Sequence, residues 1–284
     1  MRQPQVIADE LNQIGTINNL SGIFETIASM QISRIKKQVL ASKDFFSDLW
    51  QLYTEIAIED VDIDAGFGVR ATETKNLFLA LTGEGGFSGD IDQKLIDWML
   101  KQYDPSTTDI IVIGHHGAVQ LAQRGISIKK YYKMPAEDKN IDVTEIMEMI
   151  TRYPQTTAFY QTYISLTSQD VKSISLQAAV KSLSDDIKLG EAITTSNYIF
   201  EPSDRDVVKY LESTMLQVAL VQIIFESKLA QYASRFRAMT AAHDRAGEMT
   251  DDLRLQFNRA KRSKADERLK EIITGMKLVN GGAS

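Results

Sequence analysis

The segment FESKLAQYASRFRAMTAAHDRAGEMTDDLRLQFNRA, residues 225–260, carries an apolar or small side chain at alternating steps of four and three. This spacing averages 3.5 residues and keeps one seam of a helix facing a partner helix, as in a coiled coil. After a slip of one residue the alternation resumes at Ala265. The seam consists of Phe225, Leu229, Tyr232, Phe236, Met239, Ala242, Ala246, Met249, Leu253, Phe257, Ala260, Ala265, Leu269, Ile272 and Met276.

The helix around this segment is predicted to run from Ser203 to Val279, because the stretch lacks proline and Ser203 or Asp204 can cap its start. At a rise of 1.5 Å per residue, such a helix would be roughly 110 Å long. That length exceeds the width of a small domain, so we expect the helix to project as a stalk. A second helix is then needed to cover its seam.

A second long helix is predicted from Gln5 to about Ile58, with Pro4 in its first turn. Gly15 and Gly22 interrupt it, either because they are merely tolerated or because they let another backbone come close. We expect this helix to pair antiparallel with the last one. Its expected apolar face contains Ile7, Leu11, Ile14, Ile17, Leu20, Phe24, Ile27, Met30, Phe46, Leu49, Trp50, Tyr53 and Ile56.

Between the two helices the periodicity becomes strand-like. Strands are predicted at Asn76–Thr82, Asp109–Gly114, Thr157–Leu166 and Val171–Leu176, with helices after Asp90, from His116 to Arg124, and after Asp142. Glu59–Thr74 and Gly190–Glu201 are interpreted as connecting loops. The predicted fold is therefore α/β, with a small, mostly parallel, Rossmann-like sheet inserted into a long antiparallel coiled coil. The expected divisions are an N-terminal stalk helix at 1–58, an α/β foot domain at 59–202 and a C-terminal stalk helix at 203–284.

Composition excludes several classes of function. The chain has 284 residues, a net charge of −6 and no cysteine, which disfavours nucleic-acid binding, disulfides and thiolate chemistry. We find no apolar run of about 18 residues and no signal-peptide pattern, so we expect no direct membrane insertion. The alternating acids Asp60, Asp62 and Asp64 lack the glycine and glutamate that a calcium-binding EF-hand loop requires.

No catalytic constellation emerges either, and no cofactor or metal is expected. The turn from Gly83 to Gly89 follows a strand and opens a helix, as phosphate-binding turns do, but no Lys-Ser or Lys-Thr follows it. We favour a structural turn, because Glu84 and Asp90 place negative charge where a phosphate would lie. His115 and His116 point in different directions on a helix and cannot share a metal ion.

Two basic clusters lie on the long helices. Arg34, Lys36 and Lys37 belong to the first helix, and Lys261, Arg262 and Lys264 belong to the last. A charge run is usually a solvated face, and Asp266 with Lys270 at i and i+4 supports that interpretation. A surrounding partner protein is the alternative.

The chain resembles the gamma subunit of the rotary proton-translocating ATP synthase, as a divergent member. The stretch RFRAMTAAHDRAGEMTDDLRLQFNRAKRSKADERLKEIITG, residues 235–275, is similar to that family's last helix. RIKK, residues 34–37, resembles its Lys-Leu-Arg-Arg segment, and LTGEGGFSGDID, residues 81–92, resembles its Thr-Ser-Asp-x-Gly-Leu-Cys-Gly-Ala-x-Asn turn. Departures occur at Ile27-Ala28, where the family has Met-Lys, at Lys261-Arg262, where it has Arg-Gln, and at Asp266, where it has Thr.

This resemblance implies a non-catalytic rotor shaft that transmits torque between a membrane ring and a catalytic head. It implies that alpha and beta subunits surround the stalk, and that an epsilon-type subunit and the membrane c-ring contact the foot. It also implies a peripheral place on the cytoplasmic face of a bacterial plasma membrane. The residues expected to contact the head are Arg34, Lys36, Lys37, Met239, Asn258, Lys261, Arg262, Glu271 and Met276.

Two other functions stay open on the sequence alone. One is a nucleotide-binding α/β enzyme with a coiled-coil arm, which requires the turn at Gly83–Gly89 to bind phosphate. The other is a scaffold or tether that uses the coiled coil only to dock a protein. Nucleotide titration tests the first, and the identity of co-purifying proteins tests the second.

Overall fold

A computed structural model describes residues 2–56, 71–138, 141–185, 201 and 203–281 of the chain. The expected loops at Glu59–Thr74 and Gly190–Glu201 lie for the most part outside these residues. The chain divides into two compact units, Ala28–Phe236 on the one hand and Met1–Ile27 with Arg237–Ser284 on the other. We call them the sheet unit and the terminal unit, and describe each by itself.

Two long helices contribute to both units. Helix α1 spans Pro4–Ile56 and helix α6 spans Asp204–Gly281, which confirms both predicted helices. Proline is accepted at the first position of α1 because its missing N–H has no intrahelical partner there. Ser203 caps α6, since its Oγ accepts a hydrogen bond from the backbone N–H of Asp206 at 3.2 Å.

The sheet unit contains one five-stranded sheet with the order β3-β2-β1-β4-β5. Strands β1, β2, β3 and β4 run parallel to their neighbours, and β5 pairs antiparallel with β4, so the predicted mostly parallel sheet is confirmed. The register pairs Leu79 with Ile111 and with Ala158. The strands are β1 (Asn76–Leu81), β2 (Thr108–Ile113), β3 (Lys130–Tyr132), β4 (Thr156–Tyr163) and β5 (Gln169–Ser175).

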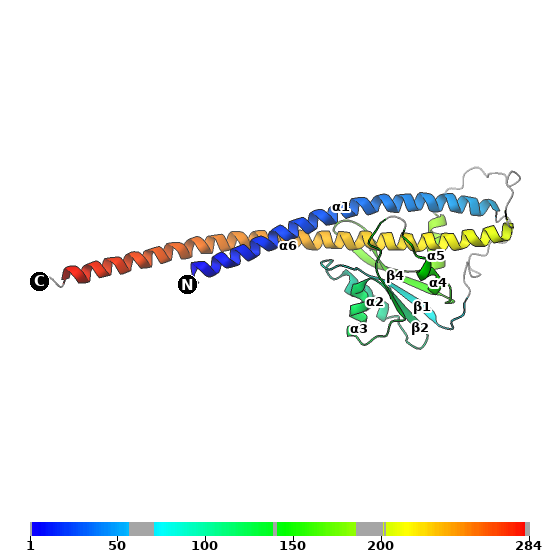
Figure 1. Ribbon diagram of the computed structural model, residues 1–284, viewed down its shortest axis with the longest axis horizontal. Coiled ribbons are helices and arrows are strands. Elements are labelled where there is room, and N and C mark those ends of the chain that lie inside the picture. Colours follow the sequence, from blue (N-terminus) through cyan, green and yellow to red (C-terminus); the bar gives the residue numbers. More distant parts are fainter. Residues whose placement is uncertain (1, 57–70, 139–140, 186–200, 202, 282–284) are drawn as a thin grey trace. The chain divides into compact units, whose positions relative to one another are not determined.

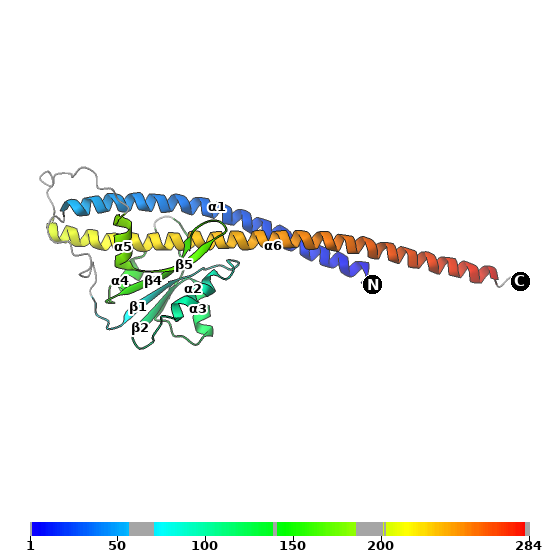
Figure 2. The ribbon, with the colours of Figure 1, turned by 180° about the vertical axis from the view of Figure 1, so that it is seen from behind.

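Helices cover both faces of this sheet, as parallel strands that are apolar on both sides require. Helices α2 (Ile91–Leu100) and α3 (His115–Gln123) pack on one face through Leu95, Met99 and Leu121. The other face carries α4 (Thr144–Ile150), α5 (Leu176–Asp185) and the parts of α1 and α6 that belong to this unit. Figures 1 and 2 show these layers from opposite sides.

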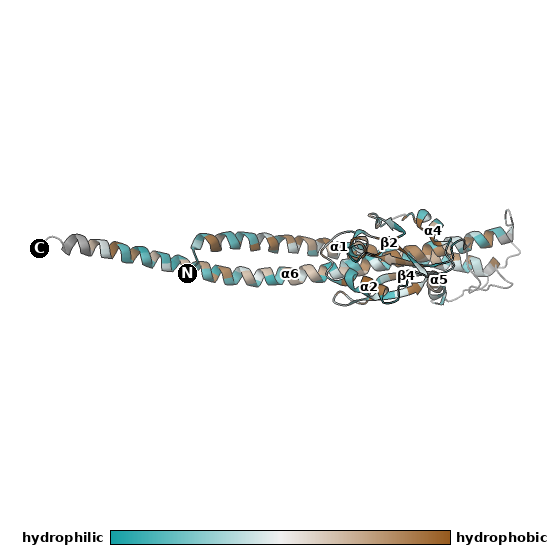
Figure 3. Ribbon diagram, turned by 90° about the horizontal axis from the view of Figure 1, so that it is seen from below, coloured by the Kyte–Doolittle hydropathy of each residue, from teal (hydrophilic) through white to brown (hydrophobic). Residues whose placement is uncertain are grey.

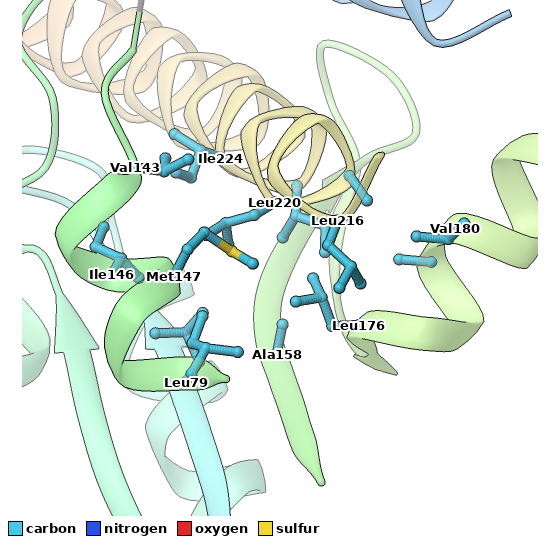
Figure 4. Packing of buried hydrophobic residues seen from close by; sticks show 14 of the residues in the cluster. Leu79, Val143, Ile146, Met147, Ala158, Leu176, Val180, Leu216, Leu220 and Ile224 are labelled. Atoms are coloured by element: carbon cyan, nitrogen blue, oxygen red, sulfur yellow. The ribbon is translucent and has the colours of Figure 1, made fainter. Parts of the chain in front are cut away.

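The larger core joins α6 to the sheet. Leu216 and Leu220 of α6 point toward Leu79 and Ala158 of the sheet, Ile224 of α6 lies beside Val143, and α4 and α5 close the two sides (Figure 4). Truncating one such fully buried leucine to alanine typically costs about 2–5 kcal/mol. The sheet is therefore fastened to α6 by ordinary core packing.

This packing also explains why part of α6 is unusually apolar, a feature that the sequence analysis missed. Within Asp206–Met276 lies a stretch long and apolar enough to cross a membrane, although we expected none. Length and apolar composition alone are weak evidence for a membrane span, because the buried core helix of a soluble protein can have both. Here the apolar side chains of α6 include Met215, Leu216 and Leu220, which are buried in the core of the sheet unit.

Two elements were not predicted. Strand β3 has only three residues, and its side chains are exposed or half-buried, so it lacks an apolar pattern. Helix α5 begins where we expected a strand to end. Its signal was present, since Ser175 caps the helix through Ala178 N–H and Leu176, Ala179 and Val180 follow at helical spacing.

The predicted apolar face of α1 is wrong in its middle. Ile17, Leu20, Ile27 and Met30 are exposed. The true seam keeps a strict four-three alternation that starts at Ile7, so Asn18, Ser21 and Glu25 occupy it in place of apolar residues. Brown and teal residues accordingly mix along both long helices in Figure 3. The buried or half-buried seam positions are Ile7, Leu11, Ile14, Asn18, Ser21, Glu25, Ala28, Ile32, Ile35, Val39, Ser42, Phe46, Leu49 and Tyr53.

The predicted seam of α6 is confirmed only in part. In the sheet unit, Phe225 and Leu229 are buried against Ile32 and Ile35 of α1. In the terminal unit, Met239, Ala246, Leu253 and Ala260 are buried, but Met249 is half exposed. Ile7 packs against Leu253 and Ala260 near the start of α1. Beyond that level the side chains of Leu269, Ile272 and Met276 are more than half exposed, so no second helix among the described residues covers them.

Candidate functional site

The glycine-rich turn between β1 and α2 already holds anions of its own. The backbone N–H of Gly83 donates to both carboxylate oxygens of Asp92 at 3.2 and 3.1 Å. The Glu84 carboxylate accepts hydrogen bonds from the backbone N–H of His115, at the start of α3, and from that of Met134. Tyr131 adds its hydroxyl to the same carboxylate at 3.1 Å. Asp92 therefore occupies the first N–H of the turn, and the Glu84 carboxylate lies at the start of α3, where it would repel a phosphate.

The carbonyl groups of this turn face α6. Arg235 donates from Nε to Gly86 O at 3.0 Å and from Nη2 to Gly85 O at 3.1 Å. Ser234 donates its hydroxyl to Ser88 O at 2.7 Å. The turn therefore acts as a clasp between the sheet and α6. Its geometry does not support the nucleotide-binding alternative.

A buried polar network extends this clasp. Asp92 of α2 accepts a hydrogen bond from Gln161 Nε2 of β4 at 2.7 Å. Gln161 Oε1 in turn accepts from Ser227 Oγ at 2.6 Å and from Gln231 Nε2 at 3.3 Å, both on α6. Gln161 and Ser227 are fully buried, so each of these groups depends on its partners. The network links α2, β4 and α6 in one hydrogen-bonded chain.

His116 forms the outer end of the network. Its Nδ1 lies 3.0 Å from Asp92 Oδ2. The hydrogen bond to Asp92 raises the pKa of the imidazole, and burial opposes that rise. Arg235 also opposes it, whereas Glu84 supports it. His116 thus serves hydrogen bonding within the clasp, and His115 is exposed.

A buried ion pair lies on another side of α6. Lys228 donates to Asp138, and its Nζ also donates to Pro135 O at 2.9 Å. Both charged side chains are almost fully buried. Arg34 of α1, which is half exposed, reaches the same carboxylate at 3.4 Å. This triad joins α1, α6 and the segment that follows β3.

The two predicted basic clusters fall in different units. Arg34, Lys36 and Lys37 are exposed residues of the sheet unit, and Lys36 Nζ lies 5.0 Å from the centroid of the Tyr163 ring. Lys261 and Arg262 are exposed residues of the terminal unit. The contacts predicted for these residues therefore concern two separate surfaces.

The remaining predicted contact residues lie in the terminal unit. Asn258, Glu271 and Met276 are exposed. Met239 is only 8% exposed, so this chain already covers a side chain for which we predicted a partner. A cavity of about 560 Å³ lies between the two helices at this end. Apolar and basic groups line it, including Pro4, Phe257, Lys261, Lys264, Arg268 and Ile272.

Polar contacts replace apolar ones in the middle of the terminal unit. His243 Nδ1 lies 3.1 Å from Asn18 O, and Thr240 donates to Glu25 at 2.9 Å. A methyl group added at Gly22 would meet the His243 ring at 3.5 Å, an ordinary contact distance, and one at Gly15 would meet nothing. Neither glycine is needed for close approach, so the interpretation that they are merely tolerated holds.

The described residues contain no group of three or more His, Cys, Asp or Glu side chains that could hold a metal ion.

A family profile described as ATP synthase matches residues 5–279. The ATP synthase gamma chain of Halothermothrix orenii is 23% identical and covers 95% of this chain and 98% of its own length. That of Enterococcus hirae is 26% identical and covers 93% and 97%.

The chain belongs to the ATP synthase gamma-chain family. Solved structures with the same fold include a chain of the Euglena gracilis mitochondrial ATP synthase, with a TM-score of 0.55 and 13% identity. The alignment covers 92% of this chain and 96% of the Euglena chain. A chain from the Tetrahymena thermophila mitochondrial ATP synthase central stalk and c-ring has a TM-score of 0.55 and 14% identity. It covers 78% of this gamma chain and 99% of its own length.

Several structurally important residues of this gamma chain escaped the sequence analysis. Asp92 had a signal, because it shares the buried face of α2 with Leu95, Ile96 and Met99. Lys228 also had one, since it lies in the otherwise apolar and small stretch of α6. Their partners Gln161 and Asp138 are 69 and 90 residues away in the sequence, and nothing local identifies them.

Proposed function

We propose that this gamma chain is a non-catalytic shaft of the ATP synthase central stalk, which transmits torque between a membrane ring and a catalytic head. One observation carries the proposal beyond family membership. Helix α6 continues past the level at which α1 covers it, and it exposes Leu269, Ile272 and Met276 there. Apolar side chains in such an arrangement favour an enclosing protein surface.

The chemistry of the chain supports a mechanical role. In the turn that most resembles a phosphate site, the Gly83 N–H is bound to Asp92, and the carbonyl groups of Gly85 and Gly86 are bound to Arg235. We infer that ATP binds in the head subunits and that this chain has no catalytic or cofactor site. Rotation of the shaft would change the catalytic sites of the head, because the shaft contacts the head differently at each angle. A partner shifts a conformational equilibrium only if it binds the two conformations with unequal affinity.

Partners follow from this role. We propose that alpha and beta subunits surround the stalk of the two long helices, including the exposed face of α1 at Arg34, Lys36 and Lys37, and that an epsilon-type subunit and the c-ring contact the α/β foot. The two relatives with this fold come from structures whose titles name a c-ring. Arg34, Lys36, Lys37, Met239, Asn258, Lys261, Arg262, Glu271 and Met276 remain the proposed head contacts.

The sequence-based division at 1–58, 59–202 and 203–284 is retained as a functional proposal. The two compact units divide the chain differently, because their boundary lies within α1 after Ile27 and within α6 after Phe236. We propose that the clasp and the Lys228–Asp138 pair make the α/β part and α6 turn as one body. We also propose a peripheral place on the cytoplasmic face of a bacterial plasma membrane, which the bacterial relatives support.

Co-purification tests this function. The full chain, tagged within its native complex, should bring down a hexameric ATPase and c-ring subunits. A tether would bring down a different set of proteins, and that result would overturn the proposal. Met239→Asp places a charge in the seam and should lower the yield of complex, whereas Met249→Asp, at a half-exposed position of the same helix, should lower it less.

A further inference from the structure

Outside its seam with α6, the part of α1 in the terminal unit carries a stripe of exposed apolar residues. Ile17, Leu20, Ile23 and Ile27 follow one another at steps of three, three and four, so they lie along one side of the helix. Between 42% and 55% of each residue is exposed. We call these four residues the outer stripe. A continuous run of exposed apolar side chains marks an interaction surface more often than scattered ones do.

Charged residues are nearly missing from the same stretch of α1. They make up 25% of the whole chain, yet Glu25 is the only one among residues 11–33. Glu25 lies in the seam, where its Oε1 accepts a hydrogen bond from Thr240 at 2.9 Å. A helix face built for water normally carries charged side chains, so this face is suited to another surface. The exposed positions around the outer stripe are polar but uncharged, as at Thr16, Asn19 and Thr26.

Contacts along the seam hold the outer stripe outward. Near the start of α1, Ile7 packs against Leu253 of α6. Further along, His243 Nδ1 lies 3.1 Å from Asn18 O, and the hydrogen bond to Glu25 follows two turns later. Turning α1 so that the stripe faced α6 would break all of these contacts. The apolar side chains therefore stay available to a partner.

The outer side of α6 in the same unit has the opposite character. More than half of the residues from Asp251 to Glu271 are charged, and all of these charged residues are exposed. The terminal unit thus combines a highly charged helix with an uncharged, apolar helix face. Contacts to the charged helix should weaken as salt screens them, whereas apolar contacts should not.

We propose that a head subunit packs on the outer stripe through an apolar surface that has no charged group opposite Leu20 and Ile23. This inference rests on the proposed function and adds the chemistry of the contact. A charged group of the partner would lose its hydration here without gaining a counter-charge, because this face of α1 offers none. The stalk then presents chemically different sides to the head, an apolar one on α1 and an ionic one on α6.

Assembly of the full chain with purified alpha and beta subunits, measured over a range of salt concentrations, tests this inference. The double variant Leu20→Ser with Ile23→Ser should assemble at least about tenfold more weakly, because it removes two buried apolar contacts. Its salt dependence should equal that of the unmodified chain. Leu20→Met with Ile23→Val keeps the face apolar and should assemble within about twofold of the unmodified chain. Gln13→Ser, at an exposed polar position of the same helix, is the second control.

The melting temperature of each isolated variant separates folding from assembly. If Leu20→Ser prevents folding, Ile23→Ser alone decides, since Ile23 is the most exposed residue of the stripe. Undiminished assembly of Ile23→Ser, or an altered salt dependence in a folded variant, would contradict the inference.

Two further outcomes identify what else could cover the stripe or fail. A dimer of the isolated chain that the double variant dissolves, with assembly unchanged, would assign the stripe to a second copy and overturn the inference. If the unmodified chain does not assemble with alpha and beta subunits at all, the proposed function itself fails, and this inference fails with it.

Discussion

Gln161 of β4 accepts a hydrogen bond of 2.6 Å from Ser227 of α6, and neither side chain reaches solvent. Gln161 also donates to Asp92, so one amide joins the α2 side of the sheet to α6. Gln161→Leu should therefore lower the free energy of unfolding by about 2–4 kcal/mol, since it leaves several buried polar groups unpaired. Urea unfolding measures this, with exposed Gln123→Leu as the control. Equal stability of both variants would contradict the role of the network.

Stability should depend on the charge of His116. Because the hydrogen bond to Asp92 raises the pKa of His116 above its ordinary value of 6.5, the folded form holds the proton more tightly than the unfolded form. This stabilisation is complete below pH 6.5 and is lost as the pH rises through the raised pKa. His116→Gln should remove that loss, whereas His115→Gln, at an exposed neighbour, should keep it. Denaturation midpoints between pH 5.5 and 8.5 measure this change in stability, and an NMR titration measures the pKa of His116. A His116 pKa below 6.5 would contradict the prediction.

The buried Lys228–Asp138 pair should be costly to break from one side. Asp138→Leu leaves the Lys228 ammonium buried without its carboxylate, so we expect a loss of about 3–5 kcal/mol. The double variant with Lys228→Met should recover most of that loss, because no unpaired charge remains. Chemical denaturation of Asp138→Leu, Lys228→Met and the double variant gives the coupling energy. Additive losses in the double variant would show that the pair is not coupled.

The exposed end of α6 should matter for assembly and not for folding. Ile272→Asp replaces an exposed apolar side chain, so the free energy of unfolding of the isolated chain should change by no more than about 0.5 kcal/mol. Assembly with the head should weaken at least tenfold, as judged by the yield of complex. Thr274→Asp, on another face of the same turn, is the matched control. Normal assembly of the Ile272 variant would argue against an enclosing surface there.

Much of this fold could be predicted from the sequence, because its main elements carry strong periodic signals. The long helices and strands β1 and β2 lie close to their predicted bounds, since proline, capping residues and apolar runs mark them. The phase of α1 could not be predicted by apolarity alone, because Asn18, Ser21 and Glu25 lie in its seam while Ile17 and Leu20 face outward. The rule that apolar residues turn inward fails where polar partners such as Thr240 and His243 lie opposite.

The sequence predicted the chemical character of the candidate surfaces, but it did not predict the contacts of the clasp. The basic and apolar character of the terminal unit follows from Lys261, Arg262 and Met276. The clasp does not, because it depends on carbonyl groups of Gly85 and Gly86 that meet Arg235 about 150 residues later. Backbone groups carry no sequence signal, so only the folded chain shows that the carbonyl groups of this turn bind α6.

Rotation of this chain inside its complex tests the central claim most directly. The chain has no cysteine, so Lys101→Cys at an exposed position provides a unique attachment point for a bead in the sheet unit. With the catalytic head fixed to a surface, added ATP should turn the bead in one direction, with a speed that rises with ATP concentration. A complex that hydrolyses ATP at its normal rate while an attached, freely movable bead stays still would contradict the account.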